Sequence, residues 1–175
     1  MKPLVKGLVI AVIQVSLVAS LGAKLLYDRV TQPRVWVNTA PYDPNLPIRG
    51  RYVSLRLIVE PRGMGEPKTE EKWHPSQAAV LRVEKERLVA EAKPEAVPHR
   101  ASGVRMRYAT VGDAKVAVLE EPVAFFIPEQ VPDPSRRGQG EQLWVETTIP
   151  KKGPPRPIRL GVRQDDGPIV PLGLR

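Results

Sequence analysis

The stretch "YDPNLPIRGRYVSLRL", residues 42–57, combines a turn, a lone glycine and an alternating run. Asp43 and Pro44 are typical of a type I turn, because the carboxylate accepts backbone N–H groups and proline presets φ. Gly50 then permits a bulge or a close approach of two backbones. From residue 52 onward apolar side chains recur at every second position, which predicts a half-buried strand entered through a tight turn.

The same period of two continues through the chain beyond residue 33, and it favours β-strands over helices. Strands are expected at residues 34–40, 51–59, 104–110, 143–149 and 157–163, and at residues 115–127 with an interruption at Pro122. Residues 78–92 fit a hairpin, with a helix as the alternative. Turns are expected at Gly112-Asp113 and at Asp165-Asp166-Gly167. About seven to nine short strands indicate a mainly β domain, a small antiparallel β-barrel or sandwich.

The alternation also predicts which side chains face the interior of this domain. The expected core positions are Val53, Leu55, Leu57, Val104, Met106, Ile158, Leu160 and Val162. On the second strand Tyr52, Ser54 and Arg56 have the opposite parity, so they are expected on a solvated face.

An uncharged run from Gly7 to Ala23 precedes the β domain, and Leu25 and Leu26 extend it. Seventeen helical residues span about 25 Å, near the lower limit for crossing a membrane. A cleaved signal peptide is the rival interpretation, but no A-x-A cleavage site follows. Residues 1–32 are therefore expected to be an uncleaved transmembrane anchor in contact with lipid, and residues 33–175 an extracytoplasmic domain.

Composition excludes several chemistries. The chain has no cysteine, which removes disulfides, thiolate metal sites and cysteine nucleophiles. Its formal net charge is +8, and a basic domain near a membrane more naturally meets anionic head groups than nucleic acid. His74 and His99 lack a ligand spacing, and no dinucleotide or phosphate-binding fingerprint occurs, so no metal or other cofactor is expected.

Two segments resemble the motifs of the GDYXXLXY-domain family, a group of membrane-anchored bacterial proteins. The first motif is matched by Asp43, Pro44, Gly50, Tyr52 and Leu55, and the second, in "VAFFIPEQ", by Phe125, Phe126, Pro128 and Glu129. Arg51 stands where the first motif has aspartate, and Leu57 where it ends in tyrosine. This chain therefore lacks the acid and the phenol of that motif.

The resemblance implies a single-pass protein of the bacterial inner membrane with a periplasmic β domain and a polytopic membrane protein as partner. It implies no known activity. We therefore expect a binding or assembly module of unknown ligand, and we expect the two motifs to lie together as one unit. The turn chemistry at Asp43 favours a structural role for the first motif.

An anchored hydrolase with the plan of a signal peptidase is the alternative. Such an enzyme uses a serine nucleophile and a lysine base, and Ser54 with Lys85 or Lys115 are the candidates here. No catalytic motif surrounds them, so an enzyme is the less favoured interpretation.

Overall fold

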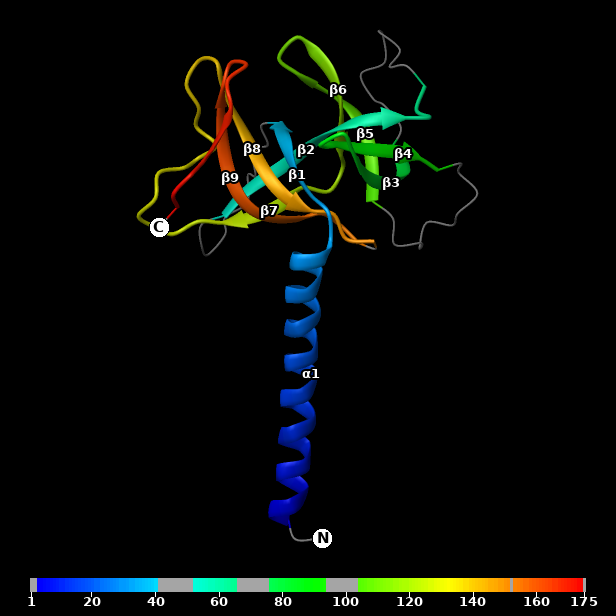
Figure 1. Ribbon diagram of the computed structural model, residues 1–175, viewed down its shortest axis with the longest axis vertical. Coiled ribbons are helices and arrows are strands. Elements are labelled where there is room, and N and C mark those ends of the chain that lie inside the picture. Colours follow the sequence, from blue (N-terminus) through cyan, green and yellow to red (C-terminus); the bar gives the residue numbers. More distant parts are fainter. Residues whose placement is uncertain (1–2, 41–51, 66–75, 94–103, 152, 175) are drawn as a thin grey trace. The chain divides into compact units, whose positions relative to one another are not determined.

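The computed structural model describes residues 3–40, 52–65, 76–93, 104–151 and 153–174. The chain divides into two compact units, Met1–Gln32 and Pro33–Arg175 (Figure 1). The first unit contains one helix, α1 (Pro3–Thr31), of 29 residues. Its segment Val5–Thr31 has 27 residues and a mean hydropathy of 2.1, so it is long and apolar enough to cross a membrane. None of its most apolar part is buried against other described residues. The predicted apolar helix is present, and it continues well past Ala23.

The second unit is built from strands. In order they are β1 (Arg34–Ala40), β2 (Tyr52–Arg62), β3 (Gln77–Glu84), β4 (Arg87–Ala92), β5 (Val104–Val111), β6 (Ala114–Leu119), β7 (Val123–Phe126), β8 (Glu141–Thr148), β9 (Arg156–Gln164) and β10 (Ile169–Pro171). Each predicted strand is confirmed, and the interruption at Pro122 separates β6 from β7. The described residues form ten strands, one more than the upper end of the expected range, because the short β10 follows the turn after β9.

β2 holds the unit together because it pairs with four other strands. One edge pairs with β7 and then β6, and the other pairs with β1 and then β4. The pairings β2–β4, β4–β3, β3–β5, β5–β6 and β6–β2 form a closed ring of five strands. All pairings are antiparallel except β2–β4, which is parallel. The antiparallel arrangement predicted from the sequence is confirmed, and this one ladder is the exception.

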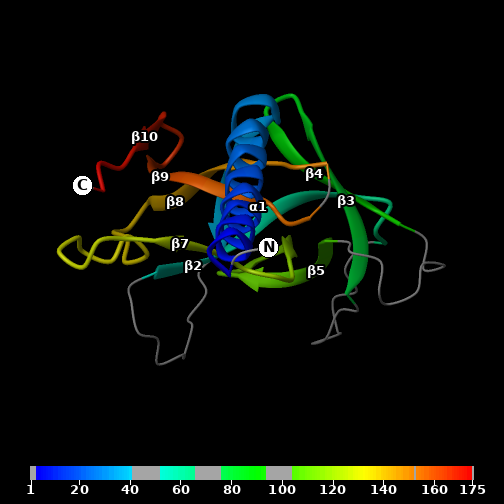
Figure 2. The same cartoon turned by 90° about the horizontal axis from the view of Figure 1, so that it is seen from below.

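The remaining strands extend from β1 in the order β1, β8, β9, β10. Figures 1 and 2 place β8 and β9 on one side of this unit and β3 and β5 on the other, with β2 between them. The fold is therefore a curled, sandwich-like antiparallel β domain, as the alternation of the sequence predicted.

The core lies between these two groups of strands. Predicted core positions Val53, Leu55, Leu57, Met106 and Leu160 are all buried, and Val104 packs partly against them. Leu57, Met106 and Leu160 are fully inaccessible.

The prediction is wrong for two core positions, because Ile158 and Val162 are only half-buried. Glu146 pairs with Arg159, but the next pair is Thr147 with Pro157, so Ile158 is the extra residue of a β-bulge. Val162 pairs with Val170 of the short strand β10, and Val170 is itself 59% exposed. This edge of the sheet therefore leaves Val162 partly accessible.

Two further expectations are settled by local structure. Residues 77–92 are a hairpin and not a helix, with positive φ at Lys85 and Glu86, as a tight two-residue turn requires. Ser54 is not on a solvated face, because it is only 9% exposed. The outward parity of β2 is therefore covered at this position, whereas Tyr52 and Arg56 of the same parity are half-buried.

Candidate functional site

The two motif segments meet in one ladder of the sheet. β2 and β7 pair antiparallel, with Tyr52 opposite Phe126 and Leu55 opposite Val123. The rings of Tyr52 and Phe126 are 6.1 Å apart between centroids and inclined by 54°. This distance is in the range of favourable aromatic pairs. The described part of the first motif therefore lies directly beside the second, while Asp43, Pro44 and Gly50 lie outside the described residues.

The motif residues separate into an inner and an outer group. Leu55 is 2% exposed and belongs to the core, against which Phe125 is packed. Phe126 has the opposite parity on β7 and is 76% exposed, and Glu129 is also exposed. Pro128 is half-buried. The outer group provides an apolar contact surface with a carboxylate nearby in sequence, which suits recognition of a partner.

A cavity of about 270 Å³ opens beside β2. The described residues that line it are Asn38, Thr39, Ala40, Ser54, Leu55, Ile58, Val111, Ser135, Arg137, Glu141, Gln142 and Leu143. Its wall is mixed, with aliphatic side chains from the core and hydroxyl, amide and charged groups from β1, β8 and the segment before β8. Such a wall suits a small polar molecule or part of a peptide.

Several polar groups at this cavity bond to one another. The Thr39 hydroxyl donates to the carbonyl oxygen of Leu143 at 2.8 Å. The Glu141 carboxylate accepts a bond from the Gly138 amide at 3.0 Å, and Arg137 Nη1 lies 3.9 Å from the same oxygen. The site therefore holds hydrogen-bonding groups of fixed position, but no described group at the cavity is a lysine.

The serine and lysines of the hydrolase alternative occupy different places. Ser54 lines the cavity, whereas Lys85 is in the β3–β4 turn and Lys115 is near the start of β6, opposite Thr110. Both lysine side chains are exposed. A lysine base must lie within hydrogen-bond reach of its serine and be desolvated, so neither lysine is placed for that role.

A second surface was missed from the sequence, and it lies on the outer face of β1, β8 and β9. Trp36, Glu146 and Arg159 are opposite one another in successive strands. Arg159 Cζ is 5.4 Å from the centroid of the Trp36 ring, and its Nε donates to the Glu146 carboxylate at 2.5 Å. The guanidinium therefore makes a cation–π contact and an ion pair at once.

The same arrangement is repeated further along these strands. Arg163 Cζ is 5.6 Å from the centroid of the Trp144 ring, one strand away. Between the two stacks lies Gly161, and a Cβ built on it would stand 2.9 Å from the Trp36 ring. The alternation placed Trp144, Arg159 and Arg163 outward in the sequence, but only the pairing of the strands brings them together with Trp36.

Comparisons with known proteins give one match. The family model described as GDYXXLXY protein matches residues 14–160, which is most of the chain and reaches from α1 into β9. No curated protein and no solved structure matches. Among the described residues, no group of three histidine or acidic side chains is placed to hold a metal ion.

Proposed function

Because the chain belongs to the GDYXXLXY family, we propose that it is a membrane-anchored module that binds or assembles with another protein of the bacterial inner membrane. In this proposal α1 is the anchor, the β domain lies in the periplasm, and the partner is a polytopic membrane protein. The ligand-binding or assembly role resides in the outer domain, because α1 offers apolar side chains suited to lipid.

The observation that carries the proposal is the aromatic pair on the joined motif strands, in which Phe126 is exposed and Tyr52 is half-buried. Phe126 is 76% exposed beside the ring of Tyr52, and exposure of this apolar surface to water is unfavourable in free energy. The side chain of Phe126 does not contribute to the core. Aromatic side chains are enriched where protein surfaces meet. Tyr52 and Phe126 therefore form the expected centre of the contact, with Glu129 at its rim.

A photocrosslinking experiment tests this contact. A benzophenone amino acid at position 126 is expected to capture a membrane protein in cells that make the full chain. The matched control is position 170, because Val170 is also an exposed apolar residue on a β-strand, at 59%. Equal adducts from both positions, or none from position 126, would refute the aromatic pair as the contact.

An anchored hydrolase is the second candidate, favoured by the place of Ser54 in the cavity. The full chain in detergent is treated with a fluorophosphonate probe, and the Ser54→Ala variant serves as the control. Labelling that disappears in the variant would support a nucleophilic serine. We expect both proteins to remain unlabelled, because neither candidate lysine lies at the cavity.

A further inference from the structure

The outer face of β1, β8 and β9 carries basic and aromatic side chains of one parity. We call this face the Trp–Arg face and define it by Arg34, Trp36, Trp144, Arg156, Arg159 and Arg163. Glu146 of β8 lies on the same face, where it pairs with Trp36 of β1 and Arg159 of β9. Its side chain is only 12% exposed. Asp166, in the turn after β9, also forms an ion pair with Arg163, at 3.4 Å. Four arginines against Glu146 and Asp166 give this face a net charge of 4 − 2 = +2.

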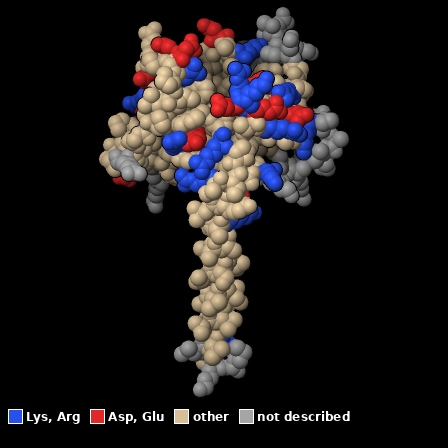
Figure 3. Space-filling model, viewed as in Figure 1, with Lys and Arg blue, Asp and Glu red and all other residues tan. Residues whose placement is uncertain are grey.

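Charges on the β3–β4 hairpin are arranged differently. There Arg62 pairs with Glu84, Arg82 with Glu91 and Arg87 with Glu60. The three arginines and three glutamates of these pairs sum to zero, so this surface carries no net charge. Figure 3 shows mixed basic and acidic side chains at these strands, and a mainly basic group with an acidic patch beside it near β8 and β9.

The chemistry of the Trp–Arg face matches a lipid surface. Guanidinium groups bind phosphate through paired N–H donors, and they remain charged at all physiological pH values. Tryptophan prefers the boundary between water and hydrocarbon, where its ring is in an apolar region and its N–H is hydrated. The Trp144 Nε1–H is buried without a hydrogen-bond partner among the described residues, so this indole has a donor to offer if the ring shifts.

The covalent chain limits how far this face can move from α1. Only Gln32 and Pro33 separate Thr31 of α1 from Arg34 of β1. Three residues span at most about 10 Å. If α1 is in a membrane, as the proposed function has it, the face begins within that distance of its end, and binding to head groups becomes an intramolecular event.

We propose that the Trp–Arg face docks on anionic phospholipid head groups of the membrane that holds α1. The arginines bind the lipid phosphates, and Trp36 and Trp144 enter the interfacial layer. This contact is separate from the aromatic pair proposed for the protein partner, and it rests on the proposed anchoring by α1. Docking would hold the outer domain in one orientation above the bilayer.

Tryptophan fluorescence of the full chain in vesicles tests the docking. The chain has three tryptophans and none of them is in α1, so a Trp73→Phe background leaves Trp36 and Trp144 as the reporters. Vesicles contain phosphatidylcholine with or without phosphatidylglycerol, and both kinds carry the same fraction of head-group nitroxide lipid. We expect stronger quenching in the anionic vesicles, and we expect high salt to remove the difference by screening.

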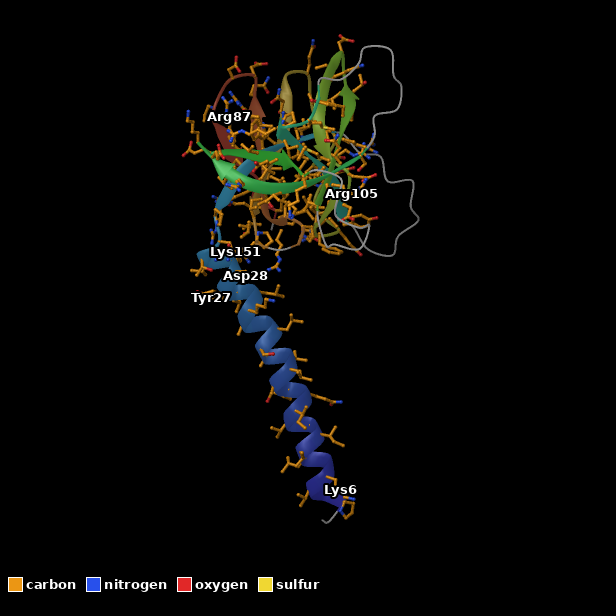
Figure 4. The ribbon with its side chains drawn as sticks, turned by 90° about the vertical axis from the view of Figure 1, so that its right-hand side faces the viewer. Lys6, Tyr27, Asp28, Arg87, Arg105 and Lys151 are labelled. Atoms are coloured by element: carbon orange, nitrogen blue, oxygen red, sulfur yellow. The ribbon has the colours of Figure 1, made fainter. Side chains whose placement is uncertain are left out.

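A charge-matched pair of variants separates this face from general basicity. Arg159→Gln with Arg163→Gln should reduce the ratio of docked to undocked protein on the order of tenfold, since each basic group near an anionic surface contributes. Arg82→Gln with Arg87→Gln removes the same charge from the balanced hairpin, where Figure 4 labels Arg87, and should leave quenching unchanged. Arg159→Lys with Arg163→Lys keeps the charge and should retain most of the difference.

Three results overturn the proposal in distinguishable ways. If the chain does not float with neutral vesicles, α1 does not anchor it in a membrane. That result refutes both this proposal and the proposed function. A chain that floats but is quenched equally in neutral and anionic vesicles refutes docking alone, and leaves an acidic protein surface as the occupant of the face. Equal effects of the two glutamine variants would assign the attraction to net charge and not to the Trp–Arg face.

Discussion

Gly161 of β9 lies against the indole of Trp36 of β1, although β8 separates these two strands. A Cβ added to Gly161 would stand 2.9 Å from Cζ3 of the ring and 2.8 Å from Cγ2 of Ile169. Contacts this short are almost never tolerated, so the glycine leaves the space that the ring occupies. The position of Trp36, and with it the cation–π contact to Arg159, depends on the absence of one methyl group.

Gly161→Ala is therefore expected to lower the free energy of unfolding by about 1–3 kcal/mol, as overpacking does. Urea titration of the purified chain in detergent, followed by tryptophan fluorescence, measures the change. Gly173→Ala is the matched control, because a Cβ at that position meets nothing within 4 Å. Equal stability of the two variants would show that Trp36 moves aside without cost.

Leu55→Ala tests the burial of the first motif. Leu55 is 2% exposed at the point where β2 leaves its pairing with β7. Removal of its side chain should cost about 2–5 kcal/mol, through lost burial and the cavity left behind. The same urea titration applies, with Val170→Ala as an exposed control expected within about 0.5 kcal/mol of the parent. A parent-like Leu55→Ala variant would show that this part of the core relaxes around the gap.

Arg159→Ala tests the ion pair beneath the Trp–Arg face. Glu146 has 12% of its side chain exposed, whereas Arg159 has 52%. The loss of the arginine leaves a mostly buried carboxylate without its partner, at a cost of about 1–2 kcal/mol after allowance for solvent at the exposed arginine. Arg82→Ala breaks a pair exposed by 63% and 52% and should cost below about 1 kcal/mol. The reverse order of the two losses would contradict the burial argument.

The orientation of the chain is tested by fusion of alkaline phosphatase after residue 175. An active fusion is expected, because the enzyme folds only outside the cytoplasm. The mature chain should also keep its full length if α1 is retained as an anchor. An inactive fusion reverses the topology, and a loss of about 20 residues shows that α1 is a cleaved signal peptide.

The sequence predicted the strands well because alternation reflects the two faces of a strand, which is a local property. The turns at Gly112 and Asp165 were also predictable, and both residues have positive φ, at 59° and 48°. The pairing partners of β2 were not predictable, because pairing depends on contacts between residues far apart in the sequence. The misplacement of Ser54 has the same origin, since its burial depends on parts of the chain that the alternation of its own strand does not reveal.

The candidate site divides in the same way. The motif residues could be identified from a resemblance, but the contact of Tyr52 with Phe126 required the β2–β7 register. The bulge at Ile158 adjoins Pro157, and proline in a strand is typical of an edge or a bulge, but alternation alone placed Ile158 inward. The Trp–Arg face combines three strands, and a single periodic run contains only one part of it.

The ladder between β1 and β8 has a consequence for the biogenesis of the domain. Val37 pairs with Val145, and the five described pairs of this ladder all join residues 34–38 to residues 144–148. A chain synthesised from its N-terminus therefore completes β1 long before β8 exists, and contacts of such large sequence separation form slowly. Until then the last residues of β1 can pair with β2, but most of β1 lacks its partner, so this ladder forms only after residue 148 has been synthesised.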